Sequence, residues 1–222
     1  MIDFEPLSES RHSHFAKELF ESAFPEEERP PFRCLEDRDD RFHFLVATLD
    51  DEPLGILTYW IFEDFAYIEH FAIDKEFRNR GLGKATMLSF MSQHPDQIVL
   101  ETEMPSTEQA DHRLEFYTDL GFTRNPQEYW QPSYHGKNDI TLQMIVMSKY
   151  ELDDGEFDEI RDILYREVYH YNGRKTKQIF VVSNIKSILY RFALKKNKKK
   201  FCQYLKSVYF CNRFRENETM AP

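Results

Sequence analysis

Two glycines, Gly81 and Gly83, stand one residue apart between an apolar segment with strand character and an apolar segment with helix character. Glycine adopts positive φ readily and lets another group approach the main chain closely. The first N–H groups of a helix lack internal partners, and the helix dipole adds partial positive charge there. Arg78, Arg80 and Lys84 add full positive charges around the same point. The stretch therefore predicts an anion site that suits a phosphate.

Two common phosphate-binding motifs do not fit this stretch. A Walker loop ends in Gly-Lys-Ser or Gly-Lys-Thr, whereas Gly83 and Lys84 are followed by Ala85. The dinucleotide-binding fingerprint needs a third glycine, and Thr86 stands at its position. A tight turn without a ligand stays open as the alternative explanation of the glycine pair.

The composition favours a globular protein with one main domain and an extension. The chain has 222 residues, of which 41% are hydrophobic and 31% are charged. No run of about 18 apolar residues predicts a transmembrane helix, and the first residues do not resemble a signal peptide. The three cysteines, Cys34, Cys202 and Cys211, favour neither a disulfide framework nor a zinc site. We therefore expect a cytoplasmic protein without a bound metal.

The net charge of −10 conceals an asymmetry along the chain. Residues 172–222 hold 13 of the 29 basic residues but only 2 of the 39 acidic residues. Residues 1–171 consequently carry a net charge of about −21, which disfavours nucleic acid as their partner because phosphates repel it. Three interpretations of the basic tail stay open: an arm that binds RNA or an anionic membrane, a segment that binds the acidic body, or translation past an ancestral stop codon.

Apolar periodicity outlines the elements that must position the glycine stretch. Helical spacing predicts helices at about 9–24, 84–93 and 106–121, and an amphipathic helix at 156–169. A second short helix around 33–40 is compatible with the pattern. β-Branched and aromatic runs predict strands at 41–49, 52–62, 66–73, 97–104, 128–135 and 140–150, with the last two joined around Gly136.

The order of these elements predicts a mixed α/β fold. Short connections make the first three strands an antiparallel meander. The strand–helix–strand connection makes the strands at 66–73 and 97–104 parallel. Ser106 or Thr107 is the expected N-cap of the helix at 106–121, and Gly121 its C-cap.

Residues 78–83, "RNRGLG", resemble the Arg/Gln-x-x-Gly-x-Gly/Ala motif of GNAT-type (Gcn5-related) N-acetyltransferases. The preceding "YIEHFAIDKEF" is similar to the fourth strand of that family, and "LEFYTDLGF" is similar to its FYxxxGF signature. The resemblance implies the GNAT fold, a central, mostly antiparallel sheet with parallel strands 4 and 5, flanked by helices. It implies an acetyltransferase domain at 1–150, beside an amphipathic helix at 151–171 that packs on or extends this domain. It does not reach the basic tail at 172–222.

The resemblance also implies a site for acetyl-CoA in a V-shaped opening between the fourth and fifth strands. The backbone of Phe71, Ala72 and Ile73 would contact the pantetheine arm. The residues of the loop would hold the pyrophosphate: Arg78, Asn79, Arg80, Gly81, Leu82, Gly83 and Lys84.

Tyr117 matches the family tyrosine that is placed to protonate the departing CoA thiolate. The acceptor amine arrives as an ammonium and must lose a proton, which either Glu69 or Glu101 would take. Because side chains alternate along a strand, we expect Glu103 on the same face as Glu101, and His70 on the opposite face from Glu69.

The implied activity is N-acetylation of a primary amine on a small molecule or peptide, by direct attack on the thioester. Two rivals stay open: an acyltransferase that uses a longer acyl-CoA, and a catalytically idle CoA-binding or regulatory module. Ala110 and Arg113 favour the idle module, since many relatives carry Asn and Ala there. The resemblance is compatible with a homodimer. It places the acceptor between the loop "FPEEERPPF" and the hairpin "YWQPSYHG", where acidic and aromatic residues would attract a cation.

Overall fold

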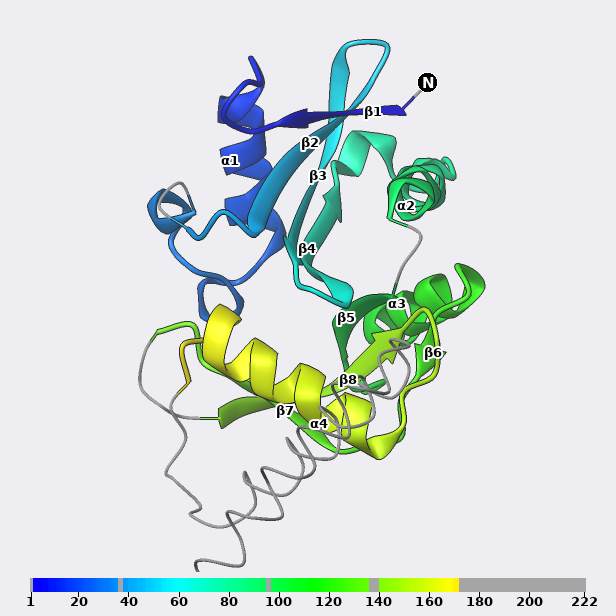
Figure 1. Cartoon of the computed structure of the whole chain (residues 1–222). Coiled ribbons are helices and arrows are strands. Elements are labelled where there is room, and N and C mark those ends of the chain that lie inside the picture. Colours follow the sequence, from blue (N-terminus) through cyan, green and yellow to red (C-terminus); the bar gives the residue numbers. More distant parts are fainter. Residues whose placement is uncertain (1, 36–37, 95–96, 136–139, 172–222) are drawn as a thin grey trace, which may run out of the picture. The chain divides into compact units, whose positions relative to one another are not determined.

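A computed structural model of the chain describes residues 2–35, 38–94, 97–135 and 140–171, all of which belong to one compact unit. An eight-stranded sheet in the order β1-β2-β3-β4-β5-β8-β6, with β7 also paired to β8, forms its centre (Figure 1). The predicted basic tail and the connection around Gly136 lie outside the described residues.

The strands are β1 (Ile2–Pro6), β2 (Phe42–Leu49), β3 (Glu52–Ile61), β4 (Phe65–Ile73), β5 (Gln97–Glu103), β6 (Thr123–Arg124), β7 (Tyr129–Pro132) and β8 (Ile140–Ser148). The α-helices are α1 (Ser13–Ala23), α2 (Leu82–Gln93), α3 (Glu108–Asp119) and α4 (Asp154–Ile163). Short 3-10 turns form η1 (Glu26–Glu28), η2 (Phe32–Cys34) and η3 (Lys75–Phe77), and a π-helical turn forms η4 (Leu164–Val168).

The mixed α/β class predicted from the sequence is confirmed. Strands β2, β3 and β4 form the antiparallel meander, and β4 and β5 are parallel. Thr107 is the N-cap of α3, because its side chain accepts a hydrogen bond from the Ala110 N–H. Two strands were not predicted. β1 is an edge strand paired only with β2, and β6 has only two residues, so neither leaves a clear alternating pattern.

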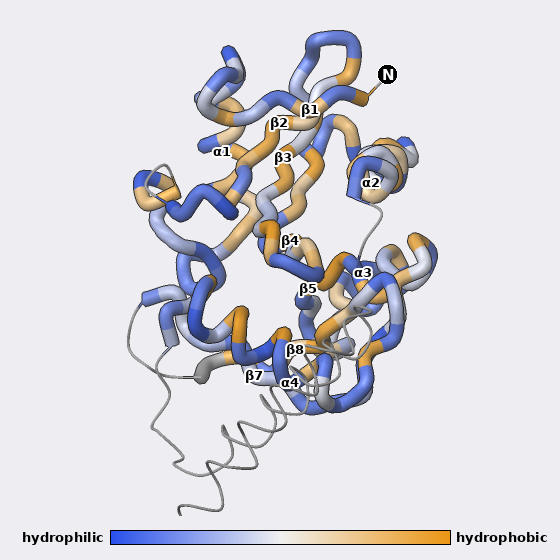
Figure 2. Tube along the Cα trace, viewed as in Figure 1, coloured by the Kyte–Doolittle hydropathy of each residue, from blue (hydrophilic) through white to orange (hydrophobic). Residues whose placement is uncertain are grey.

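Helices cover both faces of the sheet. Along β3, Leu57 and Tyr59 pack in one core with residues of α2 and α3, whereas Ile56 packs with α1 and Trp60 packs with α4. Since neighbouring residues of a strand point to opposite faces, α2 and α3 lie on one face and α1 and α4 on the other. Figure 2 shows hydrophobic residues concentrated on the central strands. None of the helices among the described residues is long and apolar enough to cross a membrane.

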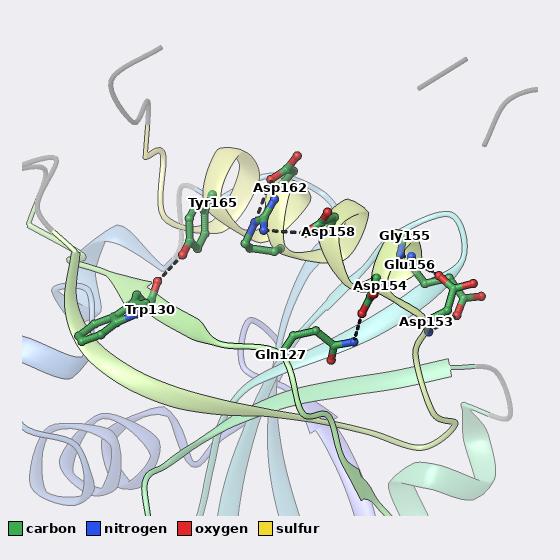
Figure 3. Close-up of polar contacts among 10 residues, drawn as sticks. Gln127, Trp130, Asp153, Asp154, Gly155, Glu156, Asp158, Asp162 and Tyr165 are labelled. Carbon is green, nitrogen blue, oxygen red and sulfur yellow. Dashed lines mark hydrogen bonds and ion pairs between the residues drawn. The ribbon is translucent and has the colours of Figure 1, made fainter. Parts of the chain in front are cut away.

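Helix α4 and the π-helical turn after it are hydrogen-bonded to the β6–β7 connection and to β7 (Figure 3). Its N-cap, Asp153, forms a capping box with Glu156, and the Gln127 side chain donates to Asp154. Tyr165 lies in the turn η4 just beyond the helix, and its hydroxyl donates to the carbonyl oxygen of Trp130 in β7. The π-helical turn η4 follows directly and points Tyr169 into the core between α4 and the sheet.

Candidate active site

Strands β4 and β5 separate partway along their length. They pair from Phe65 with Gln97 to Ile68 with Leu100, and no further. Beyond that point β4 stays paired with β3 as far as Ile73, while β5 stays paired with β8. The β5-facing edge of β4 from residue 69 to 73 therefore has no strand beside it among the described residues. A V-shaped opening results, with backbone N–H and C=O groups along one side.

A β-bulge lies where the opening begins. Thr58 of β3 is opposite His70 and Tyr59 is opposite Ile68, so Glu69 is an extra residue in β4. The expectation that Glu69 and His70 point to opposite faces is therefore wrong. Glu69 accepts from the Trp60 indole, and His70 packs against aromatic side chains of α1 on the same face.

His70 is a packed histidine. Its ring lies 5.0 Å from the Phe20 ring and 4.7 Å from the Phe24 ring. Its Nδ1 is 3.0 Å from Thr58 Oγ1. Burial lowers the pKa of His70 and favours the neutral ring.

The glycine loop has the backbone geometry of an anion site. Asn79 and Gly81 have φ of 59° and 74°, and α2 begins directly after Gly81. The first intrahelical bond is donated by Ala85 to the Gly81 carbonyl. The N–H groups of residues 82–84 precede that bond, so helix geometry leaves them free for an anion.

The cations expected around the loop lie beside it. Arg78 donates through Nε to the Ile73 carbonyl and so ties the loop to the end of β4. Arg80 lies over the Phe77 ring, with its guanidinium carbon 5.7 Å from the ring centroid. Lys84 is 3.8 Å from Asp119, but both side chains are exposed. The loop, its cations and the open edge of β4 together suit a diphosphate and the chain attached to it.

The three residues predicted to contact the pantetheine arm lie on the open edge of β4. Phe71 stacks on Phe116 of α3, with 6.2 Å between ring centroids. Ile73 points to the same face, while Ala72 packs in the core beneath α1. The side chains of the three residues point to different faces, but the backbone groups of all three lie along the part of β4 that is not paired with β5.

Tyr117 projects from α3 into the core beside the opening. Its ring packs against Phe116 and Phe122, and burial raises its pKa to about 12. The hydroxyl makes no hydrogen bond to any described residue, so it can donate to a substrate atom. Glu103 and Arg113 form an ion pair nearby; Arg113 acts to lower the pKa of Tyr117 and Glu103 acts to raise it.

Glu69 forms a buried ion pair. Arg38 Nη1 lies 2.5 Å from Glu69 Oε2, which also accepts from Trp60 Nε1 at 2.8 Å. Burial acts to raise the pKa of Glu69, but Arg38, His70 and the two hydrogen bonds outweigh it and hold this pKa below its ordinary value. The second oxygen, Oε1, is buried without a hydrogen-bond partner. Glu69 is thus ionised and keeps one acceptor atom free.

Glu101 lies among neutral donors. It accepts from Tyr129 at 2.6 Å, from Gln131 at 2.6 Å and from Tyr169 at 2.8 Å. Burial raises the pKa of Glu101, and the hydrogen bonds partly oppose this. Both carboxylate oxygens are engaged, in contrast to those of Glu69.

Sequence reasoning missed Arg38, Trp60 and Tyr169. Arg38 stands in a charge-rich stretch, "EDRDD", that reads as a solvated loop. Trp60 was assigned only to a strand, and Tyr169 only to the amphipathic helix. One signal was available: a buried glutamate needs a cation or several donors, and these residues supply them. No group of three potential metal ligands occurs in the described part of the chain.

Comparisons with known proteins agree on one family. The model described as the Acetyltransferase (GNAT) family matches residues 12–122. A GNAT-family protein from Bacteroides thetaiotaomicron is 38% identical, covers 75% of this chain and 98% of its own, and has a TM-score of 0.70. A comparison with curated proteins found no significant match.

Two more distant structures hold the cosubstrate or its product. A GNAT acetyltransferase from Elizabethkingia anophelis with acetyl-CoA bound is 15% identical, covers 66% of this chain and 96% of its own, and has a TM-score of 0.47. A Bacillus subtilis acetyltransferase in complex with CoA is 16% identical, covers 67% and 97%, and has a TM-score of 0.48.

Proposed function

This chain belongs to the GNAT family of acetyltransferases, and on that premise we propose that it transfers the acetyl group of acetyl-CoA to a primary amine of a small molecule or peptide. The observation that carries the proposal is the opening between β4 and β5, which begins after Ile68 and Leu100 and ends at the glycine loop. It offers a strand edge for the pantetheine amides and an anion site for the pyrophosphate in one continuous path.

The chemistry follows from the groups beside the opening. The neutral amine attacks the thioester carbonyl carbon, and a carboxylate takes the proton that the ammonium must lose. Glu69 suits this role better than Glu101, because it is ionised and its Oε1 has no other partner. Glu101 stays the alternative base. The carbon–sulfur bond then breaks, and the Tyr117 hydroxyl donates a proton to the departing thiolate. The nitrogen loses its second proton as the amide forms, and this proton balances the one that Tyr117 has given up.

Acetyl-CoA binding to the glycine loop is tested with two isosteric variants. The position of a Cβ on Gly81 has no atom within 4 Å, and both Asp and Asn tolerate its positive φ. Gly81→Asp and Gly81→Asn therefore share the same strain and differ by one negative charge. In calorimetric titration we expect the Asp variant to bind acetyl-CoA at least about tenfold more weakly than the Asn variant.

Release of the CoA thiol in the presence of an amine panel tests the transfer itself. Release that depends on the amine supports the acetyltransferase. Tight binding without release of CoA with any amine would support the idle CoA-binding module, which the Ala110 and Arg113 departures favour. Failure of the wild-type protein to bind acetyl-CoA would overturn both.

A further inference from the structure

A buried base needs a route for the proton that it takes. Transfer of an acetyl group from a thioester to an ammonium releases one net proton, which the base has to pass on before the next turnover. The Glu69 side chain has no exposed surface. Arg38 and the Trp60 indole are donors without an acceptor atom, so neither can receive this proton. His70 is a poor acceptor, because burial disfavours its charged form.

Three tyrosine hydroxyls gather between Glu69 and Glu101. Tyr67 belongs to β4, Tyr134 follows β7 and Tyr169 follows η4 directly. The Tyr67 and Tyr169 hydroxyls are 3.0 Å apart, and the centroids of the Tyr134 and Tyr169 rings are 5.0 Å apart. Burial raises the pKa of Tyr134, and Glu69 and then Glu101 add to this rise. The Tyr134 hydroxyl is therefore close to both carboxylates.

The hydrogen bonds of this cluster lead towards Glu101. Tyr169 donates to Oε2 of Glu101 at 2.8 Å, and Tyr129 donates to Oε1 at 2.6 Å. Burial raises the pKa of Tyr134 and of Tyr169 well above the ordinary value, so both hydroxyls stay protonated. A neutral hydroxyl has one proton to donate and lone pairs that accept. A tyrosine in such a chain can therefore take a proton on one side while it gives its own proton on the other.

The surroundings of the two carboxylates set the direction of transfer. Burial opposes the ionisation of both. Arg38 and the other partners of Glu69 outweigh this effect and lower its pKa, whereas the neutral donors of Glu101 do not, and its pKa is raised. A proton therefore has a lower free energy on Glu101 than on Glu69. Of the described titratable groups that face the two carboxylates, only Arg38 is charged at neutral pH. These groups are Arg38, Tyr67, His70, Tyr129, Tyr134, Tyr165 and Tyr169.

We propose that Tyr134 and Tyr169 form a proton relay from Glu69 to Glu101. The inference rests on the proposed acetyl transfer and gives each of its two candidate bases a role. Glu69 Oε1 takes a proton from the ammonium and so becomes a donor. It gives this proton to the Tyr134 hydroxyl, which passes its own proton to Tyr169. Tyr169 in turn gives its own proton to Oε2 of Glu101. Glu69 is then a carboxylate again and both tyrosines are neutral. Glu101 is a carboxylic acid until the products leave and water takes the proton.

The relay gives the C-terminal part of the described chain a role in the chemistry. Tyr169 follows η4 and lies outside residues 12–122, which are the part that the family model matches. Leu164 and Val168 of η4 pack in the same core as Tyr67 and so hold Tyr169 next to β4. The motifs of the family therefore do not predict this route.

The test measures kcat with the amine of the panel that releases most CoA. Tyr169→Phe and Glu101→Gln both interrupt the relay, and each should lower kcat at least about tenfold. Because both break the same route, the double variant should be no slower than the slower single variant. Tyr129→Phe is the matched control, because it also removes a buried donor from Glu101 but leaves the relay intact. It should lower kcat much less than Tyr169→Phe does. Acetyl-CoA affinity, measured in parallel, should be the same in all variants.

The pH profile separates a relay from a structural role. Glu101 has to be ionised to receive the proton, so the acid limb of kcat in the wild type should follow the raised pKa of Glu101. Glu101→Gln removes this requirement, and the acid limb should move to lower pH, towards the lowered pKa of Glu69. An unchanged acid limb, multiplied losses in the double variant, or an equal loss in Tyr129→Phe would each overturn the relay.

A wild-type protein that binds acetyl-CoA but releases no CoA with any amine would overturn the acetyl transfer, and a titration then judges the relay. NMR of isotope-labelled glutamate side chains, assigned with Glu69→Gln and Glu101→Gln, shows which carboxylate takes a proton first as the pH falls. Protonation of Glu101 before Glu69 keeps the direction of the route and rejects only the transfer. Protonation of Glu69 first would overturn the route itself.

Discussion

Glu69 and Glu101 are the first residues of β4 and β5 beyond their last shared pair, Ile68 with Leu100. The two carboxylates thus flank the start of the opening, but their surroundings differ. Arg38 forms an ion pair with Glu69, and the pKa of Glu69 is lowered. Glu101 has only neutral donors, and its pKa is raised by burial. From the sequence, Glu69 and Glu101 are equivalent candidates for the catalytic base, because the sequence does not show which carboxylate has a cation nearby.

The buried ion pair predicts a large loss of stability for Arg38→Met. The Glu69 side chain is fully buried and the Arg38 side chain is only 12% exposed, so the substitution leaves a buried charge unpaired. We expect a loss of about 3–5 kcal/mol in urea denaturation at neutral pH. The double variant Arg38→Met/Glu69→Gln should recover much of it. A double variant no more stable than the single one would contradict this account.

The ion pair of Arg38 and Glu69 also predicts how the free energy of unfolding depends on pH. Because the pKa of Glu69 is lowered in the folded state, its contribution to stability is present above the ordinary carboxyl pKa. It is lost as the pH falls through the lowered pKa. Glu69→Gln should therefore reduce the acid dependence of the free energy of unfolding below about pH 4.5. The ion pairs of Arg41 with Asp39 and Glu167, which are more exposed, are the control, and Arg41→Met should change stability much less than Arg38→Met.

Tyr117→Phe tests the proposed proton donor. The variant keeps the ring contacts with Phe116 and Phe122, so fold and acetyl-CoA affinity should be unchanged. Loss of the donor should reduce kcat by about 10²- to 10⁴-fold. Since the pKa of Tyr117 is about 12, the loss should be constant from neutral pH to about pH 11. Tyr150→Phe, at a 56% exposed position, should leave kcat unchanged. A similar decrease in both variants would exclude the assigned role.

Much of the scaffold could be predicted from sequence because its signals are local. The β-branched and aromatic runs of β2 and β3, the apolar run of β5 and the Thr107 cap of α3 each depend on residues close together in the chain. The glycine loop could be predicted for the same reason. Its positive φ at Gly81 and its position before α2 follow from six consecutive residues.

The chemistry of the opening could not be predicted, since it depends on register and on distant partners. The bulge at Glu69 appears only when β3 and β4 are paired, and it reverses the direction expected for His70. Arg38 is 31 positions before Glu69, and Tyr169 is 68 positions after Glu101. No pattern within either segment indicates these contacts. The opening is therefore a property of the fold rather than of a motif.

Tyr169→Phe should destabilise the fold more than Tyr165→Phe. The Tyr169 hydroxyl donates to Glu101, accepts from Gln131 at 3.1 Å and lies 3.0 Å from the Tyr67 hydroxyl. Its removal leaves buried polar groups short of a partner, at about 1–3 kcal/mol. It also removes one donor from Glu101, so the pKa of Glu101 should rise further.

Tyr165 provides the matched control, because it is the same residue type a few positions earlier. Its hydroxyl makes one bond, to the Trp130 carbonyl at a partly exposed site (Figure 3). Water can replace that donor, so Tyr165→Phe should cost less than about 1 kcal/mol. Urea denaturation of both variants measures the difference. Equal losses would show that the buried network around Glu101 contributes no more than a single surface hydrogen bond.

Gly55 and Gly83 both lie close to Ile73 at the end of β4. Substitutions at these two glycines can distinguish the packing of β4 from the access of a ligand to the nearby backbone. A Cβ on Gly55 would lie 2.6 Å from the Ala72 carbonyl oxygen and 2.7 Å from Ile73 Cδ1. Gly55→Ala should therefore cost about 1–3 kcal/mol and displace the end of β4. A Cβ on Gly83 would lie 3.5 Å from Ile73 Cγ1, which is an ordinary contact.

Gly83→Ala should accordingly be as stable as the wild type, or more stable by up to about 1 kcal/mol, because alanine favours the helix. If the N–H groups of residues 82–84 bind the pyrophosphate at close range, the added methyl group should still weaken acetyl-CoA binding. Denaturation and calorimetry on the same preparations decide this. A loss of affinity without a loss of stability cannot come from unfolding, so it would place the nucleotide at the first turn of α2. Unchanged affinity in Gly83→Ala would instead mean that Arg78, Arg80 and Lys84, rather than close contact with the backbone, provide the attraction.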